Sequence, residues 1–396
     1  MKSNYSTAVF FGSSSFVFLN FGLTVQADEL GLDAIMIGGA YTVFTGTMLL
    51  LRPLVGYCLD RFGRRWFFTS AFIFYTAAMF SFAFADDYLG LYVARFLQGI
   101  GASLMWVSAR TIVTDLTEPG GLGEAMGKLT QTSVRGSMIG GFYGFTLVGM
   151  MPFSQAWYLG FIGYGVMALV ALVWSLLRVR ETRQEVGPRM QRFGWRELKQ
   201  NPDLIKALII AAITGFAAAL IEPVYLLLLK HNFDVSVIVL AFVFLPSGLV
   251  FAFIPKYAGR FADKWGRGLT IALGVSLAAV VGGALPFWSS LILIAASYIL
   301  FAVGWAMASP AVDGLVASFS DDTNRGRVMG AKEAAAGLGA ALGPLLGGYL
   351  YDSVNSTAPF LFNAGLLLLV ALIAVLWFGN RSATDTTLSV DAREQP

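Results

Sequence analysis

Long apolar runs separated by short polar turns dominate the chain. A helix that crosses a membrane needs about 20 mostly apolar residues to span about 30 Å of hydrocarbon. Such runs form two sets of six, near residues 6–26, 35–58, 67–86, 88–114, 123–150 and 154–178, and then near 205–229, 235–258, 268–286, 289–318, 326–351 and 358–379. The pattern predicts an all-α membrane protein with twelve transmembrane helices.

The longest polar segment divides these runs into two halves. It extends from Arg178 to Lys206 and lies between the sixth and seventh runs. We therefore expect a six-helix bundle at residues 1–178, a cytoplasmic linker at 179–204, a second six-helix bundle at 205–379 and a cytoplasmic tail at 380–396.

Positive charge is concentrated on one side of the expected spans. Lys and Arg crowd residues 59–66, 178–206, 256–267 and 325–332, whereas Lys230 is the one basic residue in the opposite loops. Cytoplasmic loops carry the excess of Lys and Arg in membrane proteins. The chain is therefore expected to cross the cell membrane many times, with both termini in the cytoplasm.

The composition argues against a soluble enzyme. Only 13% of the residues are charged, whereas soluble domains carry about 25%. A single cysteine, Cys58, and a single histidine, His231, can form neither an intrachain disulfide nor a histidine-rich zinc site. No phosphate-binding loop of the ATPase type is present in the sequence. We expect no enzyme activity, no cofactor, no metal and no nucleic-acid partner.

The two halves repeat each other at one fixed offset. Shifting the chain by 203 residues matches three separate regions: Gly56 and Asp60 fall on Gly259 and Asp263, Gly63-Arg64 on Gly266-Arg267, Met126-Gly127 on Met329-Gly330, and Gly140 and Gly144 on Gly343 and Gly347. An even number of spans per half gives both halves the same orientation in the membrane. In transporters with such a parallel repeat, substrate binds near the midplane, between two halves that rock.

The segment Gly-Tyr-Cys-Leu-Asp-Arg-Phe-Gly-Arg-Arg at residues 56–65 resembles the signature loop of the major facilitator superfamily. A degenerate copy at residues 259–267 lies where that family repeats it. We call these the first and second signature segments. The resemblance covers essentially the whole chain and implies the family's fold of two pseudo-symmetric six-helix bundles. It also implies a secondary transporter working by alternating access.

In the family, the signature loop acts as a latch that holds one conformational state. The resemblance implies that Asp60 faces the start of span eleven, where a helix N-terminus stabilises a carboxylate, and that Arg64 pairs with Asp115 at the end of span four. Gly56 and Gly63 are expected to allow a close approach or a tight turn. The expected latch residues are Gly56, Asp60, Arg61, Gly63, Arg64, Asp115, Gly259, Asp263 and Arg267.

A second motif gives a finer hypothesis. The segment from Arg95 to Gly101 in span four resembles the motif of proton-coupled members, especially drug–proton antiporters. Those antiporters carry a Gly-Pro pair in span five, but here the pair is Gly343-Pro344 in span eleven. The leading prediction is proton-coupled export of amphiphilic drugs or metabolites. The alternatives are import of a small polar solute and movement of a lipid or glycolipid.

Charged residues inside spans are functional candidates because their burial in a membrane is costly. Glu222 lies beside Pro223 in an otherwise apolar run, and burial there would favour its protonated form. Glu222, Arg95 and Asp313 are the candidates for proton coupling. For Arg95 the alternative is that its side chain extends to the outer membrane surface. The candidates for contact with substrate in the cavity are Arg135, Asn20, Tyr225 and Trp106.

Arg110 and Asp313 occupy equivalent positions in the repeat, in spans four and ten. Those spans flank the cytoplasmic mouth from opposite halves in this fold. A bridge between the two charges would close that mouth, and separate local partners are the alternative. The expected partners of the whole protein are a small-molecule substrate, protons and the lipid bilayer, and we expect it to act as a monomer.

Overall fold

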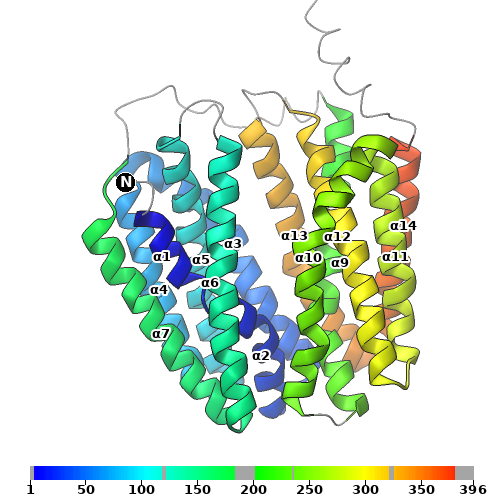
Figure 1. Cartoon of the computed structure of the whole chain (residues 1–396), viewed down its shortest axis with the longest axis horizontal. Helices are drawn as coiled ribbons and strands as arrows, with labels where there is room; N and C mark the ends of the chain where they lie inside the picture. The colour runs from blue at the N-terminus through cyan, green and yellow to red at the C-terminus, as the bar shows by residue number, and fades with distance from the viewer. Residues whose placement is uncertain (1–3, 118–121, 183–200, 234–235, 321–324, 380–396) are drawn as a thin grey trace, which may run out of the picture. The chain divides into compact units, whose positions relative to one another are not determined.

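A computed structural model of the chain describes residues 4–117, 122–182, 201–233, 236–320 and 325–379 (Figure 1). The regular structure of these ranges is helical throughout, without a strand. Most of the expected linker at 179–204 and the whole expected tail at 380–396 lie outside the described residues. The chain forms two compact units, one up to residue 189 and one made largely of the remainder.

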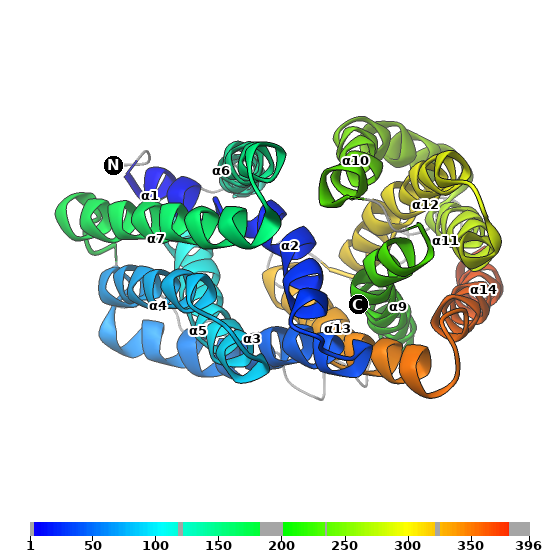
Figure 2. The same cartoon turned by 90° about the horizontal axis from the view of Figure 1, so that it is seen from below.

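The described residues of the first unit form six long helical segments. The first segment consists of two helices that are separated by three serines, and the others are single helices. Their bounds are α1 Asn4–Gly12, α2 Phe16–Glu29, α3 Ala34–Phe62, α4 Arg65–Ala83, α5 Tyr88–Asp115, α6 Leu122–Met150 and α7 Phe153–Arg178. Seen along the helices, α4 lies between α5 and α7 (Figure 2), and it packs extensively on both.

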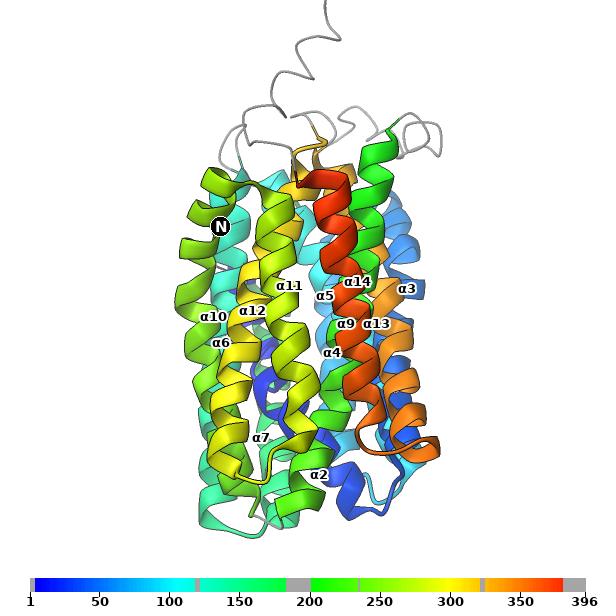
Figure 3. The ribbon, with the colours of Figure 1, turned by 90° about the vertical axis from the view of Figure 1, so that its right-hand side faces the viewer.

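The second unit also contains six segments. Their bounds are α9 Pro202–Phe233, α10 Val237–Trp265, α11 Arg267–Ala284 with the short 3₁₀ helix η1 Leu285–Phe287, α12 Leu291–Ala317, α13 Arg325–Ser353 and α14 Ala358–Phe378. Within this unit α13 packs along α9, and α11 packs against both α12 and α14 (Figure 3). Within the described residues, nine segments across the two units are long and apolar enough to span a membrane. The all-α membrane fold predicted from the apolar runs is therefore confirmed.

The first span differs from its prediction, because the run expected at 6–26 is not one continuous helix. It is broken at Ser13, Ser14 and Ser15, all three of which are buried. The Ser133 hydroxyl of α6 donates a hydrogen bond of 2.8 Å to the Ser13 hydroxyl. A β-carbon added at Gly140 of α6 would collide with the Ser14 carbonyl. The break is thus stabilised by a polar contact and by close backbone packing.

Glycines of the repeat bring helix backbones together in both units. Besides Gly140, Gly136 of α6 lies directly against the Phe10 carbonyl of α1. The equivalent positions under the 203-residue shift are Gly339 and Gly343 of α13, which lie directly against carbonyls of α9. Small residues permit such backbone contact between membrane helices. The internal repeat in the sequence is therefore also a repeat in packing.

Candidate functional site

The first signature segment forms the end of one helix and the start of the next. Asp60 and Arg61 lie in the last turn of α3, so the prediction that Asp60 belongs to a loop is wrong. Gly63 has a φ of +95°, a conformation that favours glycine, and Arg64 precedes the first residue of α4. The turn therefore consists of Gly63 and Arg64. The side chain of Asp60 lies outside the described part of the structure.

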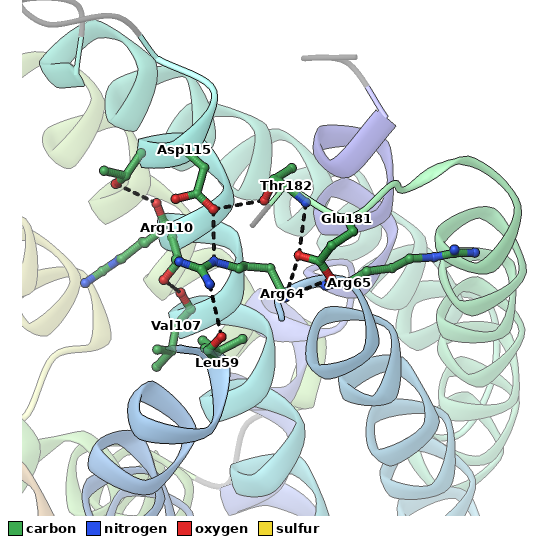
Figure 4. A network of polar contacts seen from close by, with 10 residues as sticks. Leu59, Arg64, Arg65, Val107, Arg110, Asp115, Glu181 and Thr182 are labelled. Carbon is green, nitrogen blue, oxygen red and sulfur yellow. Dashed lines mark hydrogen bonds and ion pairs between the residues drawn. The ribbon is translucent and has the colours of Figure 1, made fainter. Parts of the chain in front are cut away.

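Arg64 pairs with Asp115 as expected (Figure 4). Its Nε donates to Asp115 Oδ2 at 3.0 Å, and its Nη1 donates to the Leu59 carbonyl at 3.1 Å. The two charged side chains are only 14% and 17% exposed. A charge-assisted hydrogen bond between partly buried groups is stronger than an exposed ion pair. The pair connects the turn after α3 to the C-terminal end of α5.

Two residues that follow α7 complete this network and were not predicted. The Glu181 carboxylate accepts hydrogen bonds from the backbone N–H groups of Arg64, at 2.9 and 3.1 Å, and of Arg65, at 3.1 Å. The Thr182 hydroxyl donates to Asp115 Oδ2 at 3.0 Å. Glu181 thus satisfies N–H groups at the start of α4 that have no partner within that helix. Figure 4 shows these residues converging from α3, α4, α5 and the segment after α7.

The second signature segment repeats the turn. Asp263 lies in the last part of α10, Gly266 has a φ of +92°, and Arg267 begins α11. The Arg267 side chain lies against α12, with its Nε 3.3 Å from where a β-carbon on Gly314 would stand. The Asp263 side chain, like that of Asp60, falls outside the described residues. Each signature segment is therefore built around a glycine with positive φ.

Gly56 and Gly259 do not have the close approach expected of Gly56. Both lie inside helices, α3 and α10, and an added β-carbon at either would meet no atom within 4 Å. The expected turn belongs to Gly63 alone, because Gly63 alone of the first segment has a backbone conformation that requires glycine. Arg61 is exposed and its guanidinium lies 5.5 Å from the centre of the Phe62 ring.

Arg95 is buried inside the first unit. Its side chain is 1% exposed, and its Nη1 donates to the Gln98 side chain at 2.9 Å. The guanidinium stands 4.8 Å from the ring centre of Tyr41 and 5.3 Å from that of Phe44, both on α3. The alternative in which Arg95 reaches the outer surface is therefore wrong. Aromatic faces and an amide stabilise a charge in a place where hydrocarbon would not.

Tyr41 extends this polar cluster to α2. Its hydroxyl donates to the Asn20 carbonyl at 2.9 Å and lies 3.1 Å from the Thr24 hydroxyl. Asn20, predicted to contact substrate, is half-buried and contributes its backbone oxygen here. Since Tyr41 lies under the Arg95 guanidinium, α2, α3 and α5 meet around one buried charge. The sequence around Tyr41 is apolar, so it gave no signal that Tyr41 packs inside the protein and does not face lipid.

Glu222 and Tyr225 lie on α9 in different environments. Glu222 is exposed at the surface of its unit, and its predicted role in proton coupling stays a prediction. Tyr225 is 1% exposed and stacks on Tyr298 of α12, with ring centres 4.4 Å apart and planes at 12°. Tyr225 therefore packs between α9 and α12, and its predicted contact with substrate stays a prediction.

Asp313 has a local partner that the sequence did not indicate. Lys332 Nζ of α13 lies 2.7 Å from Asp313 Oδ1 and 3.0 Å from Glu333 Oε1. Arg110 is exposed on α5, with its guanidinium 5.8 Å from the ring centre of Trp106. A bridge between Arg110 and Asp313 would join the two units and stays a prediction.

The remaining candidate, Arg135, lies in the middle of α6 and is exposed. Its predicted role in the cavity stays a prediction. Among the described residues, no group of three or more His, Cys, Asp and Glu side chains is placed to hold a metal ion.

Comparisons with known proteins agree with this architecture. The family model described as Major Facilitator Superfamily matches residues 5–331 and again residues 257–394. Over 392 residues the chain is 24% identical to multidrug resistance protein 1 of Bacillus subtilis, covering 95% of this chain and 97% of that protein. It is 27% identical over 319 residues to the class B tetracycline resistance protein of Escherichia coli, covering 77% and 76%.

Among solved structures, the crystal structure of nucleoside transporter NupG superposes with a TM-score of 0.77, covering 95% of this chain and 98% of that one at 12% identity. At that identity the likeness shows the fold alone. The family model, in contrast, covers nearly the full length, including both signature segments and both units. The chain therefore belongs to the major facilitator superfamily and is a multi-pass membrane transporter of small molecules, not an enzyme.

Proposed function

We propose that this transporter exports amphiphilic drugs or metabolites across the cell membrane by alternating access, driven by entry of protons. The distribution of Lys and Arg supports a cytoplasmic location for both termini. Two similar proteins are named for multidrug and tetracycline resistance, which supports export of drug-like compounds. The transporter acts as a monomer.

The observation that carries the mechanism is the network around Arg64. Alternating access requires contacts that hold one state and release in the other. The pairing of Arg64 with Asp115, together with the Glu181 carboxylate at the start of α4, holds the first signature segment in one conformation. The segment can therefore present Asp60, at the end of α3, as one rigid element. In this proposal Asp60 meets the start of α13 in the latched state.

Proton coupling is assigned to charged groups inside the spans. Glu222 is an acid on an apolar helix, and its side chain is exposed at the surface of its unit. Arg95 contributes a fixed buried charge in the first unit. Substrate and proton then compete for the negative charge of Glu222, which is how an antiporter exchanges one for the other.

A transport screen in sealed vesicles tests the function directly. Uptake of labelled amphiphilic cations, nucleosides and lipids is measured with and without an imposed pH gradient. Accumulation of amphiphiles against their gradient in the export direction supports the proposal. Accumulation of a polar solute in the opposite direction, or movement of a lipid, would replace export with one of those functions.

Two substitutions test the assigned roles. Asp60→Asn should slow flux severely while equilibrium binding of the same substrate stays near the wild-type value, and full flux would refute the latch. Glu222→Gln should abolish the dependence of flux on the pH gradient while downhill exchange persists. If the Glu222→Gln protein still accumulates substrate under a pH gradient, Glu222 is not the essential proton carrier.

A further inference from the structure

The end of the first unit at which its signature segment lies presents an arginine beside an exposed tryptophan. Arg65 begins α4, and its guanidinium lies 5.0 Å from the centre of the Trp66 ring. Trp66 is 60% exposed. Both residues stand at the end of a segment that is long and apolar enough to span a membrane. Tryptophan is enriched at that depth because its ring is apolar and its N–H is polar. Arg65 and Trp66 therefore stand where lipid headgroups meet acyl chains.

The Arg65 side chain is held by the neighbouring helix. Its Nη2 donates a hydrogen bond of 3.0 Å to the carbonyl of Leu176, in the last turn of α7, where carbonyls lack partners within the helix. Figure 4 shows that the Arg65 side chain extends away from Asp115, the partner of Arg64. A guanidinium carries five N–H donors. Since Nη2 is its one hydrogen-bonded nitrogen among the described residues, Nη1 remains for an anion.

Exposed apolar side chains continue from this end along both helices. The hydroxyl oxygens of Thr69 and Ser175 are 2.8 Å apart, so α4 and α7 lie side by side here. Each helix exposes two large apolar residues that share one of its faces, because they are seven residues apart on α4 and three residues apart on α7. We call these four residues the α4–α7 face: Trp66 and Ile73 of α4, and Val173 and Leu176 of α7.

No carboxylate compensates the Arg65 guanidinium among the described residues, where it forms no ion pair. The Glu181 carboxylate accepts hydrogen bonds from the backbone N–H groups of Arg64 and Arg65. Its negative charge therefore stabilises the N-terminus of α4. Arg180, in the same segment after α7, is exposed and adds a second positive charge. The charge at this end of the α4–α7 face thus suits an anionic ligand.

The repeat does not reproduce this arrangement. Under the 203-residue shift, Arg65 falls on Gly268 of α11, and Ser175 falls on Phe378 of α14. Gly268 lies directly against the backbone of Phe378. The second unit therefore has a close backbone contact at the position where the first unit has an arginine side chain. Packing of the repeated fold does not require Arg65, so the arginine calls for a role specific to the first unit.

We propose that Arg65 and the α4–α7 face bind an anionic phospholipid of the surrounding leaflet. The lipid phosphate accepts hydrogen bonds from the Arg65 guanidinium, whose planar shape suits phosphate. One acyl chain lies along Trp66 and the apolar residues that follow it. Because Arg65 adjoins Arg64, which pairs with Asp115, the bound lipid also stabilises the turn of the first signature segment. The site depends on neither the direction nor the driving force of transport.

Native mass spectrometry of the full chain in a neutral detergent tests the site. Dioleoyl phosphatidylglycerol, dioleoyl phosphatidylcholine and glycerol phosphate are titrated, and the dissociation constant of the first adduct is measured. The wild type should bind phosphatidylglycerol about fivefold more tightly than phosphatidylcholine, as expected for one basic residue near an anionic group. Arg65→Gln should abolish this preference, whereas Trp66→Ala should weaken the binding of both lipids. The control Lys264→Gln removes an exposed cation beside Trp265 of the second unit and should keep the preference.

Three results would overturn the lipid site. They are equal dissociation constants of the wild type for the two lipids, an equal loss of preference in Lys264→Gln and Arg65→Gln, and binding of glycerol phosphate as tight as that of phosphatidylglycerol. A thermal scan of the wild type covers the case in which Arg65→Gln does not fold. Phosphatidylglycerol should raise the unfolding temperature above its value in phosphatidylcholine, because a ligand of the folded state stabilises it. Equal unfolding temperatures in the two lipids would also contradict the site.

Discussion

Replacing Asp115 by asparagine should weaken the fold of the first unit measurably, because the Asp115 carboxylate stabilises the turn between α3 and α4. Its Oδ2 accepts hydrogen bonds from Arg64 Nε and from the Thr182 hydroxyl, both at 3.0 Å. Hydrogen bonds to charged groups contribute about 1.5–3 kcal/mol when buried, and exposed ion pairs about 0–1 kcal/mol. Since the pair is 14% and 17% exposed, we expect a loss of about 1–2 kcal/mol.

A double-mutant cycle isolates the pair itself. Arg64→Gln should cost at least as much as Asp115→Asn, because it also removes the bond to the Leu59 carbonyl. The double variant should lose less than the sum of the two single losses, by about 1 kcal/mol. The measurement is the free energy of unfolding in mixed detergent micelles. The control Lys206→Gln breaks the pair with Asp203, whose side chains are 39% and 25% exposed, and should change this free energy by less than about 0.5 kcal/mol.

Additivity would refute this reasoning. If the double variant loses the sum of the single losses to within about 0.3–0.5 kcal/mol, Arg64 and Asp115 do not interact energetically. Losses no larger than that of the Lys206→Gln control would show that the pair behaves as an exposed one. Either result would also remove the physical basis for a rigid signature segment, and the proposed latch would then need another source of rigidity.

Two further predictions use the same unfolding measurement. Gly63→Ala should destabilise the protein by about 1–2 kcal/mol, because Gly63 has a φ of +95° and an added β-carbon would stand 2.5 Å from Glu181 Oε2. Gly56→Ala should instead stabilise the protein by about 0.5–1 kcal/mol, because Gly56 lies inside α3 and faces open space. Equal effects of the two substitutions would contradict the assignment of the turn to Gly63. Arg95→Lys should lower the free energy of unfolding by about 1–2 kcal/mol, because lysine lacks the planar guanidinium that lies over the Tyr41 ring and donates a hydrogen bond to Gln98. An unchanged free energy of unfolding would show that only the positive charge matters at this position.

The spans were predictable because the bilayer dictates their length. Apolar runs must be about 20 residues long to cross it, so the expected span at 88–114 corresponds to α5 at Tyr88–Asp115 and that at 358–379 to α14 at Ala358–Phe378. The break at Ser13–Ser15 was not predictable in this way. The break depends on contacts with α6, and the mean hydropathy of the first segment carries no information about those contacts.

The site was predicted only where residues carry a motif. The pairing of Arg64 with Asp115 followed from the signature segment, whereas Glu181 and Lys332 were missed. Neither residue belongs to a motif or to a repeating pattern of apolar and polar positions, so the sequence did not indicate its partner. Glu222 and Tyr225 show a related limit. In a helix that is apolar on all sides, spacing does not tell the packed face from the exposed face.

The two units share a fold but differ in the ion pairs near their signature segments. In the first unit, Arg64 pairs with Asp115, at the start of α4 and the end of α5. The 203-residue shift places Arg267 and Ser318 at the corresponding positions, so the second unit cannot form that ion pair. Among its described residues, Lys332 pairs with Asp313, which joins α13 to α12.

This difference bears on the mechanism. The pair of Arg64 with Asp115 joins the turn after α3 to α5, whereas the pair of Lys332 with Asp313 joins α13 to α12. The two halves thus kept the turn of the signature segment but changed the helices that the ion pair joins. Breaking the pair with Lys332→Gln should therefore increase hydrogen exchange in α12 and α13 and leave α4 and α5 unchanged.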